Sequence, residues 1–162
     1  SVPVNFENTD IVLSPNPSKA DELEIMRRMS NMSFDSEIKT VLTKEDVFAI
    51  REEVNKVSIS ESLEKYIIEL VFATRDPKAY GLNKAAEYIQ FGVSPRASIN
   101  LNLAAKCTAY FNNREYVLPE DIKEVAVDVL NHRMILNYEA EADNVSTIDI
   151  IKDLLNKIPI GN

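Results

Sequence analysis

The sequence is poor in the residues that form tight turns, disulfides and metal sites. Its 162 residues include 3 glycines, 1 cysteine, 1 histidine and no tryptophan. So little glycine argues against many tight hairpins and favours helices. The single Cys107 excludes an internal disulfide and fits a reducing compartment, and we expect it to pack as a small apolar residue. Because Cys107 and His132 lack the spacing of zinc ligands, no protein-held metal is predicted, and His132 is expected to contact the last carbonyls of a helix.

Positive charge is also scarce. The formal net charge is −8, and no cluster of lysine and arginine stands out along the chain. Proteins bind nucleic acids, and anionic membrane surfaces, largely through basic side chains, so neither is predicted as a partner. No apolar run approaches the length of a membrane span, and the first residues lack a secretory signal pattern. These absences predict a cytoplasmic protein.

The motifs of several catalytic classes are missing as well. The sequence contains neither G-x-x-x-x-G-K-[ST] nor G-x-G-x-x-G, and Ser94 lies in GVSPR rather than in G-x-S-x-G. Neighbouring acids such as Glu52 and Glu53 do not face each other on a helix, so they are expected to be solvated. We therefore predict no catalytic residue in this chain alone and no phosphate cradle of its own.

The sequence does contain a series of helix start signals. Ser18, Thr43 and Ser146 are each followed three residues later by aspartate, which resembles a capping box. Pro119 precedes two acids, as is typical of the first turn of a helix. The segment 78–92 is ambiguous: NKAAEYI would suit a helix, whereas EYIQF alternates like a short strand. These signals predict helices with short connections.

The apolar residues after these start signals recur at helical spacing, and we expect them to form the core. The predicted core faces are Leu23, Ile25, Met26 and Met29; Leu63, Ile67, Leu70 and Val71; Ile99, Leu103, Ala104, Cys107, Tyr110 and Phe111; Ile122, Val125, Ala126, Val129 and Leu130; and Ile150, Ile151, Leu154 and Leu155. The predicted fold is all-α, a bundle of about six helices with candidate short strand pieces at 10–13, 87–91 and 115–118. Residues 1–17 are expected to be a tail or the remnant of an upstream segment, and residues 18–160 one helical domain.

One predicted helix start carries an unusual charge. In GVSPRA, Ser94 is a good N-cap, Pro95 fits the first helical position and Arg96 would be the second helical residue. A cation there opposes the helix dipole, at a cost of a few tenths to about 1 kcal/mol. Two explanations stay open: Arg96 is a surface residue paired with a nearby acid, or its guanidinium and the free N–H groups bind a phosphate.

The residues around Arg96 also resemble a known family. The stretch YIQFGVSPRASINLNLAAKCTAYFNNREYVLPEDIKEVAVDVLNHRMIL is similar to the C-terminal part of MoxR-type AAA+ ATPases, and the similarity extends over residues 15–160. The resemblance implies a helical lid that follows an ATP-binding α/β core. It assigns Arg96, in G-x-S-P-R-A, as the sensor 2 residue that reaches the γ-phosphate, next to Ser94 and Pro95. It also implies that Ile25, on the first lid helix, lies near the adenine.

Further expectations follow from this resemblance. ATP and Mg²⁺ would be held mainly by the core, so this chain alone should not hydrolyse ATP. Expected partners are the protein's own core and neighbouring subunits of a ring, and the family is associated with chaperone-like maturation of proteins that often carry von Willebrand A domains. The alternative is a stand-alone helical protein-interaction module without a nucleotide role.

The sequence departs from the family pattern in two places. Residues 1–14 do not resemble the end of the core, which suggests a foreign or rebuilt start. Leu118 stands where the family commonly has threonine or serine before P-E-D, and its side chain cannot supply a helix cap that is typically worth ~1 kcal/mol.

Overall fold

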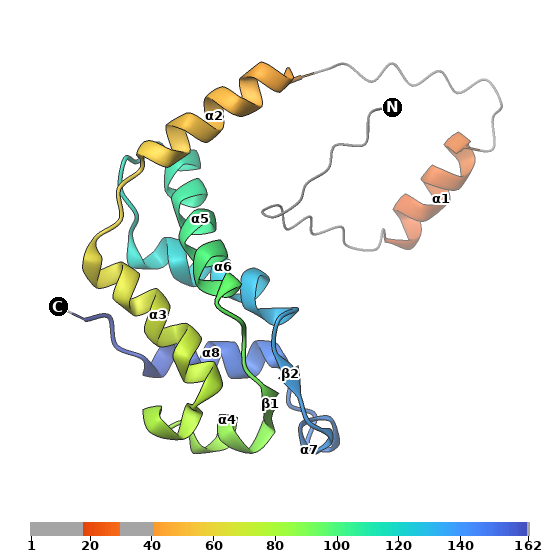
Figure 1. The fold of residues 1–162 in the computed structure, drawn as a ribbon. Coiled ribbons are helices and arrows are strands. Elements are labelled where there is room, and N and C mark those ends of the chain that lie inside the picture. Colours follow the sequence, from red (N-terminus) through yellow and green to blue (C-terminus); the bar gives the residue numbers. More distant parts are fainter. Residues whose placement is uncertain (1–17, 30–40, 162) are drawn as a thin grey trace.

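Four helices pack around the main apolar core (Figure 1). They are α3 (Glu61–Arg75), α5 (Arg96–Phe111), α6 (Pro119–Asn131) and α8 (Thr147–Lys157). The computed structural model describes residues 18–29 and 41–161. The other described elements are α1 (Lys19–Met29), α2 (Lys44–Lys56), the 3-10 helix η1 (Pro77–Tyr80), α4 (Asn83–Tyr88), β1 (Ile89–Phe91), β2 (Ile135–Leu136) and α7 (Tyr138–Ala142). The all-α prediction is confirmed, and the short helices α4 and α7 account for the difference from about six predicted helices.

The predicted helix caps are present. The Thr43 hydroxyl accepts the Asp46 N–H at 3.1 Å, and the Asp46 carboxylate accepts the Thr43 N–H at 2.8 Å. Ser146 and Asp149 form the same reciprocal pair at the start of α8. At the end of α6, Nδ1 of His132 lies 3.1 Å from the carbonyl oxygen of Asp128, which confirms the predicted helix-end histidine. Local side-chain chemistry therefore determines where these helices begin and end.

The small sheet joins two segments that are far apart in the sequence. Strands β1 and β2 pair antiparallel, with Ile89 opposite Leu136 and an irregularity before Phe91. The segment 78–92 thus contains both a helix and a strand, because α4 ends where β1 begins. Strand β2 was not predicted.

The other two predicted strand pieces have different outcomes. The segment 10–13 lies outside the described residues. The prediction for 115–118 is wrong: the structure has only a single parallel bridge there, between Ser58 and Tyr116. The physical reason is that α6 begins at Pro119, so the Leu118 N–H donates to the Asp121 carboxylate of that helix and is not available to a neighbouring strand.

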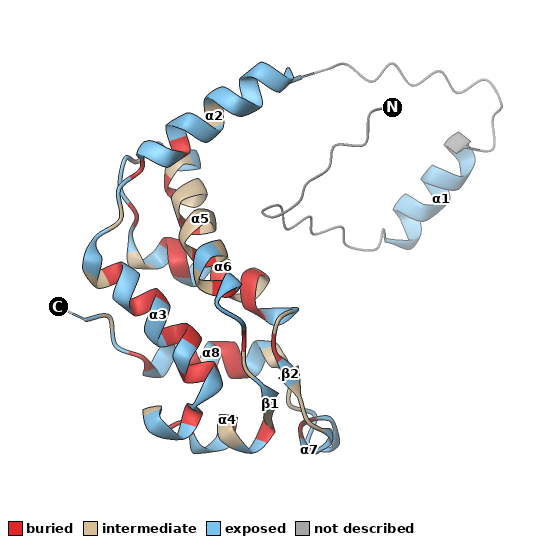
Figure 2. Ribbon diagram, viewed as in Figure 1, coloured by how far each residue is buried: buried red, intermediate tan, exposed pale blue. Residues whose placement is uncertain are grey.

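The core faces predicted for α3, α6 and α8 are confirmed (Figure 2). The buried members are Leu63, Ile67, Leu70, Val71, Ile122, Ala126, Val129, Leu130, Ile150, Ile151 and Leu154. Val125 and Leu155 are half-buried. Full burial of a large aliphatic side chain contributes about 1.5–3 kcal/mol, so these faces are the main source of the fold's stability.

The core face predicted for α5 is wrong. The buried residues of this helix are Ala97, Leu101, Ala105 and Ala109, at four-residue spacing. The predicted Ile99 and Phe111 are instead 60% and 73% exposed. The remaining predicted positions, Leu103, Ala104, Cys107 and Tyr110, are half-buried. Small alanine side chains let α6 approach α5 closely, and this packing outweighs the burial of the larger side chains on the other faces.

The core face predicted for the first helix is not buried either. Every side chain described in α1 is exposed, including Leu23 at 44% and Met26 at 57%. Figure 2 shows the same exposure along α1 and much of α2. Helix α2 buries Val54 near its C-terminal end, while Phe48 in its first half is 51% exposed. The main core is therefore made by the residues from Val57 onward.

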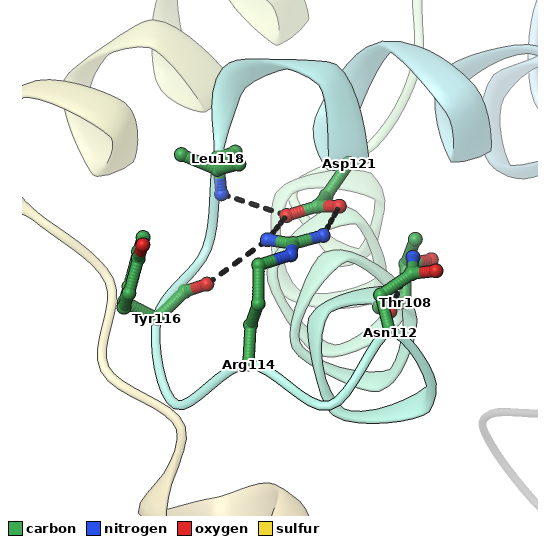
Figure 3. A network of polar contacts seen from close by, with 6 residues as sticks. All are labelled: Thr108, Asn112, Arg114, Tyr116, Leu118 and Asp121. Carbon is green, nitrogen blue, oxygen red and sulfur yellow. Dashed lines mark hydrogen bonds and ion pairs between the residues drawn. The ribbon is translucent and has the colours of Figure 1, made fainter.

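A bidentate ion pair holds the turn between α5 and α6 (Figure 3). The Nη1 and Nη2 atoms of Arg114 donate to the two carboxylate oxygens of Asp121 at 2.7 and 2.5 Å. Nη1 also donates to the Tyr116 carbonyl oxygen at 3.1 Å. Asp121 is 2% exposed and also accepts the Leu118 N–H at 2.7 Å. Leu118 supplies no side-chain cap, as predicted, but this carboxylate satisfies its backbone N–H.

Candidate functional site

The candidate site is the N-terminal end of α5. The helix begins at Arg96, one residue later than predicted, and Pro95 precedes it with helical dihedral angles, φ −56° and ψ −23°. The Ser94 carbonyl oxygen accepts the Ala97 N–H at 2.9 Å, but no side chain caps this end of the helix. The predicted N-cap role of the Ser94 side chain is therefore wrong. The first N–H groups of α5 lack the partners that capping side chains give α2 and α8.

Arg96 is exposed and has no hydrogen bond or ion pair with any residue that the structure describes. Helices α1, α2, α3, α6 and α8 all carry acids in their first turn, whereas α5 carries none. Acids in the first turn complement the positive end of the helix dipole. Helix α5 thus begins with an uncapped positive end and a guanidinium, a combination that favours an anion.

The residues just before Arg96 are held against the end of α3. The Thr74 hydroxyl oxygen accepts the Val93 N–H at 3.0 Å. Nε of Arg75 donates to the Val93 carbonyl oxygen at 2.8 Å. The Val93 side chain is 1% exposed, so its apolar part is fixed as well. Both peptide groups that flank Val93 therefore have a partner on α3, two residues before Pro95.

Gly92 allows this close contact because the site has no room for a side chain. A Cβ atom at Gly92 would lie 2.4 Å from the Thr74 carbonyl oxygen and 2.9 Å from the Arg75 Cα. Both of these atoms belong to the backbone of α3, so neither can move without shifting the helix. Glycine is required here by the approach of two backbones rather than by an unusual dihedral angle.

Gly92→Ala is expected to lower the free energy of unfolding by about 1–3 kcal/mol, because the added methyl group overpacks the contact with α3. Urea or thermal unfolding of this chain measures the effect. Gly161→Ala is the matched control, since nothing lies within 4 Å of a Cβ atom there. Equal unfolding free energies for the two variants would contradict the close contact.

A shallow, mainly apolar groove lies on the surface between α3 and α5. Ile68 and Ile99 line it, at 43% and 60% exposed, and its volume is about 410 Å³. Ile99 and Leu103 follow Arg96 at three and seven residues, so all three share one face of α5. The open surface of α5 that follows Arg96 in the sequence is therefore mainly apolar.

The structure brings Ser94, Pro95 and Arg96 together, as their adjacency in the sequence requires. It does not bring Ile25 to them: this residue lies on α1, is 49% exposed, and α1 has no extensive contact with any described element. Among residues 18–29 and 41–161, no group of three or more His, Cys, Asp and Glu side chains could hold a metal ion. No helix in these same ranges is both long and apolar enough to cross a membrane.

The sequence analysis missed Thr74, Arg75 and Gly92. Thr74 and Gly92 are separated by 18 positions and meet only in the folded chain. The one available signal was the scarcity of glycine, with only 3 in the chain, because a rare glycine directly before a helix start indicates a close backbone contact.

The comparisons with known proteins concern the family of the chain as a whole. Residues 83–154 match the AAA lid domain family. The chain is 35% identical to the chaperone MoxR1 of Mycobacterium tuberculosis over 89% of its own length and 38% of that protein. It is 32% identical to the uncharacterized protein YeaC of Bacillus subtilis, over 89% of this chain and 43% of YeaC.

A solved structure gives a stronger match. The crystal structure of a protein from Cytophaga hutchinsonii, described as a candidate ATPase, is 61% identical, with a TM-score of 0.80. The alignment covers 93% of this chain and 45% of that one. The chain thus spans less than half the length of each of these three relatives.

Proposed function

We propose, from the premise that this chain belongs to the C-terminal lid portion of the MoxR-type AAA+ ATPases, that residues 18–160 close over ATP held by a separate nucleotide-binding core. The premise explains two properties of the chain. The sequence lacks a phosphate loop, and the described residues lack a set of metal ligands. The phosphate loop and the metal ligands would belong to the core, which would hold the nucleotide and its magnesium ion.

The observation that carries this proposal is the state of Arg96. It is an exposed guanidinium at an uncapped helix start, without a partner among the described residues, on a segment fixed to α3. In the closed lid Arg96 would donate to γ-phosphate oxygens, as the sensor 2 arginine of the family does. A planar guanidinium can contact two oxygens at once, which suits a phosphate better than lysine does.

The neighbouring residues would support this contact without donating side-chain bonds of their own. Pro95 has the fixed φ that directs the chain into α5, and Ser94 links it to the segment held by α3. The first N–H groups of α5 would add partial positive charge on the same side. Ile25 would lie near the adenine once α1 packs against the core.

Lid closure would couple the nucleotide to movement of neighbouring subunits. A ligand that binds the closed state more tightly than the open one shifts the domain-closure equilibrium. The mainly apolar groove between α3 and α5 would be covered in that state by the core of the same or the next subunit. In the complete protein this movement would serve ring assembly and chaperone-like remodelling of partner proteins, including ones with von Willebrand A domains.

This chain alone is expected not to hydrolyse ATP, because the groups that cradle the triphosphate and its metal lie on the core. Phosphate release from repurified material, with magnesium present, measures this. ATP hydrolysis that persists after repurification would contradict the assignment of the triphosphate-binding and metal-binding groups to the core. In the full-length protein, the direct test is Arg96→Ala, which should reduce hydrolysis more than nucleotide affinity.

A further inference from the structure

Thr74 is an unusual residue for the place where it lies. It is 0% exposed, in the last turn of α3, among apolar neighbours. A buried hydroxyl costs free energy unless both its donor and its acceptor are used. Here the Oγ1–H donates to the Val71 carbonyl oxygen at 2.7 Å, and the same oxygen accepts the Val93 N–H at 3.0 Å. The hydroxyl therefore connects α3 to the segment that leads into α5.

The backbone between Val93, which is bound by the Thr74 hydroxyl, and Arg96 has little conformational freedom. Only Ser94 and Pro95 separate Val93 from Arg96, and the proline ring fixes the φ of Pro95. On the other side of Arg96, Ala97 is 0% exposed and packed in the core. With Val93 and Ala97 both fixed, the backbone of Arg96 cannot move unless one of these contacts breaks.

Arg75 makes a second hydrogen bond with Val93. Its Nε donates to the Val93 carbonyl oxygen, and its guanidinium carbon lies 5.0 Å from the centre of the Phe72 ring. The contact with the ring limits the positions that the guanidinium can take. Consecutive residues of α3 thus bind the N–H and the C=O of Val93.

We infer that Thr74 is a positioning residue for Arg96: through the Val93 N–H, its buried hydroxyl determines where the end of α3 places the arginine relative to the nucleotide. This inference rests on the proposed function of Arg96. A misplacement of a catalytic group by about 1 Å can lower the rate by 10²-fold. Loss of one of the two hydrogen bonds that fix Val93 should therefore lower kcat.

The test is a double-mutant cycle in the full-length protein, with kcat and KM for ATP as readouts. Thr74→Val keeps the volume but leaves the Val93 N–H without its acceptor, and we expect kcat to fall about tenfold with KM changed less than about twofold. Thr74→Ser, which keeps the hydroxyl, should restore most of the rate. In the Arg96→Ala background, Thr74→Val should change kcat by less than about twofold, since the group it positions is gone.

The cycle separates positioning from a merely structural role. A fall in kcat of equal size with and without Arg96 would overturn the inference, and so would an unchanged kcat in the protein that keeps Arg96. Thr108→Val, a half-buried threonine on α5, is the matched control and should leave kcat unchanged. If Thr74→Val does not fold, Arg75→Met, at an exposed residue, removes the donor to the Val93 carbonyl oxygen and should lower kcat only when Arg96 is present.

The outcome also distinguishes this inference from the proposed function. If Arg96→Ala damages hydrolysis and Thr74→Val does not, only the positioning role is overturned. If Arg96→Ala leaves hydrolysis unchanged, the sensor 2 role fails and the positioning role fails with it. Amide exchange in this chain alone provides an independent check: Thr74→Val should remove protection at the Val93 amide, whereas Thr108→Val should not.

Discussion

Arg96→Ala in the full-length protein is expected to lower kcat for ATP hydrolysis by about 10²-fold, the usual effect of removing one donor that stabilises developing charge. The dissociation constant for ATP should change far less, because a core with its own phosphate loop supplies most of the binding. Steady-state phosphate release and equilibrium nucleotide binding, measured on the same preparation, separate the two effects. A loss confined to kcat indicates an interaction that strengthens in the transition state.

Two further variants make this result specific. Arg51→Ala removes an exposed arginine of α2 and should leave both parameters unchanged, which controls for the loss of one positive charge. Arg96→Lys retains the charge without the planar fork and should give an intermediate kcat. If kcat and affinity are both unaffected by Arg96→Ala, the arginine is a surface residue, and a helical interaction module becomes the better description of the chain.

Much of the fold could be predicted from local sequence signals. Caps such as Thr43 with Asp46 are encoded within four residues, and the structure confirms them because their hydrogen bonds need no distant partner. Strands β1 and β2 pair across more than 40 positions, and β2 was missed since a two-residue strand carries no periodicity of its own. Helices were therefore easier to locate than the sheet.

The core face of α5 shows a second limit of prediction. Hydrophobic periodicity gives most weight to large side chains such as Ile99, but the buried face of this helix consists mainly of alanines. The choice of face depends on how closely α6 can approach, which is a property of two helices together. Ile99, about one turn after Arg96, stays exposed on a face that the proposed core would cover.

The candidate site was partly visible in the sequence. A cation directly after Ser94 and Pro95 conflicts with the dipole of its helix, and this local conflict indicated Arg96 without any knowledge of the fold. Thr74 gave no such signal, because a threonine near the end of an amphipathic helix is ordinary. Its importance follows from Val93, which is distant in sequence and adjacent in space.

Asp121→Ala is expected to lower the free energy of unfolding by about 3 kcal/mol, because it removes one partner of a buried ion pair. The side chains of Asp121 and Arg114 are 3% and 22% exposed, so the change leaves a half-buried guanidinium without its carboxylate. It also removes the acceptor of the Leu118 N–H at the start of α6. Urea unfolding of this chain, followed by circular dichroism, gives the difference.

Asp149→Ala is the matched control for this prediction. Asp149 has the same position in α8, where it accepts the Ser146 N–H at 3.0 Å, but it is exposed and its carboxylate has no arginine partner among the described residues. We expect a smaller loss than for Asp121→Ala, because only a helix cap is removed. Losses of equal size for Asp121→Ala and Asp149→Ala would mean that the buried pair with Arg114 adds nothing beyond capping.

The pH dependence provides a separate test of the same pair. Burial would raise the pKa of Asp121, but the hydrogen bonds from Arg114 and Leu118 and the arginine's charge outweigh it, so the pKa lies below its usual value of 3.8. A carboxylate with a lowered pKa stabilises the folded state above the unfolded pKa, and this contribution is lost as the pH falls through the folded pKa. The difference in unfolding free energy between the wild type and Asp121→Asn should therefore be constant near neutral pH and shrink below about pH 4. A difference that does not depend on pH would show that the carboxylate contributes through its shape alone.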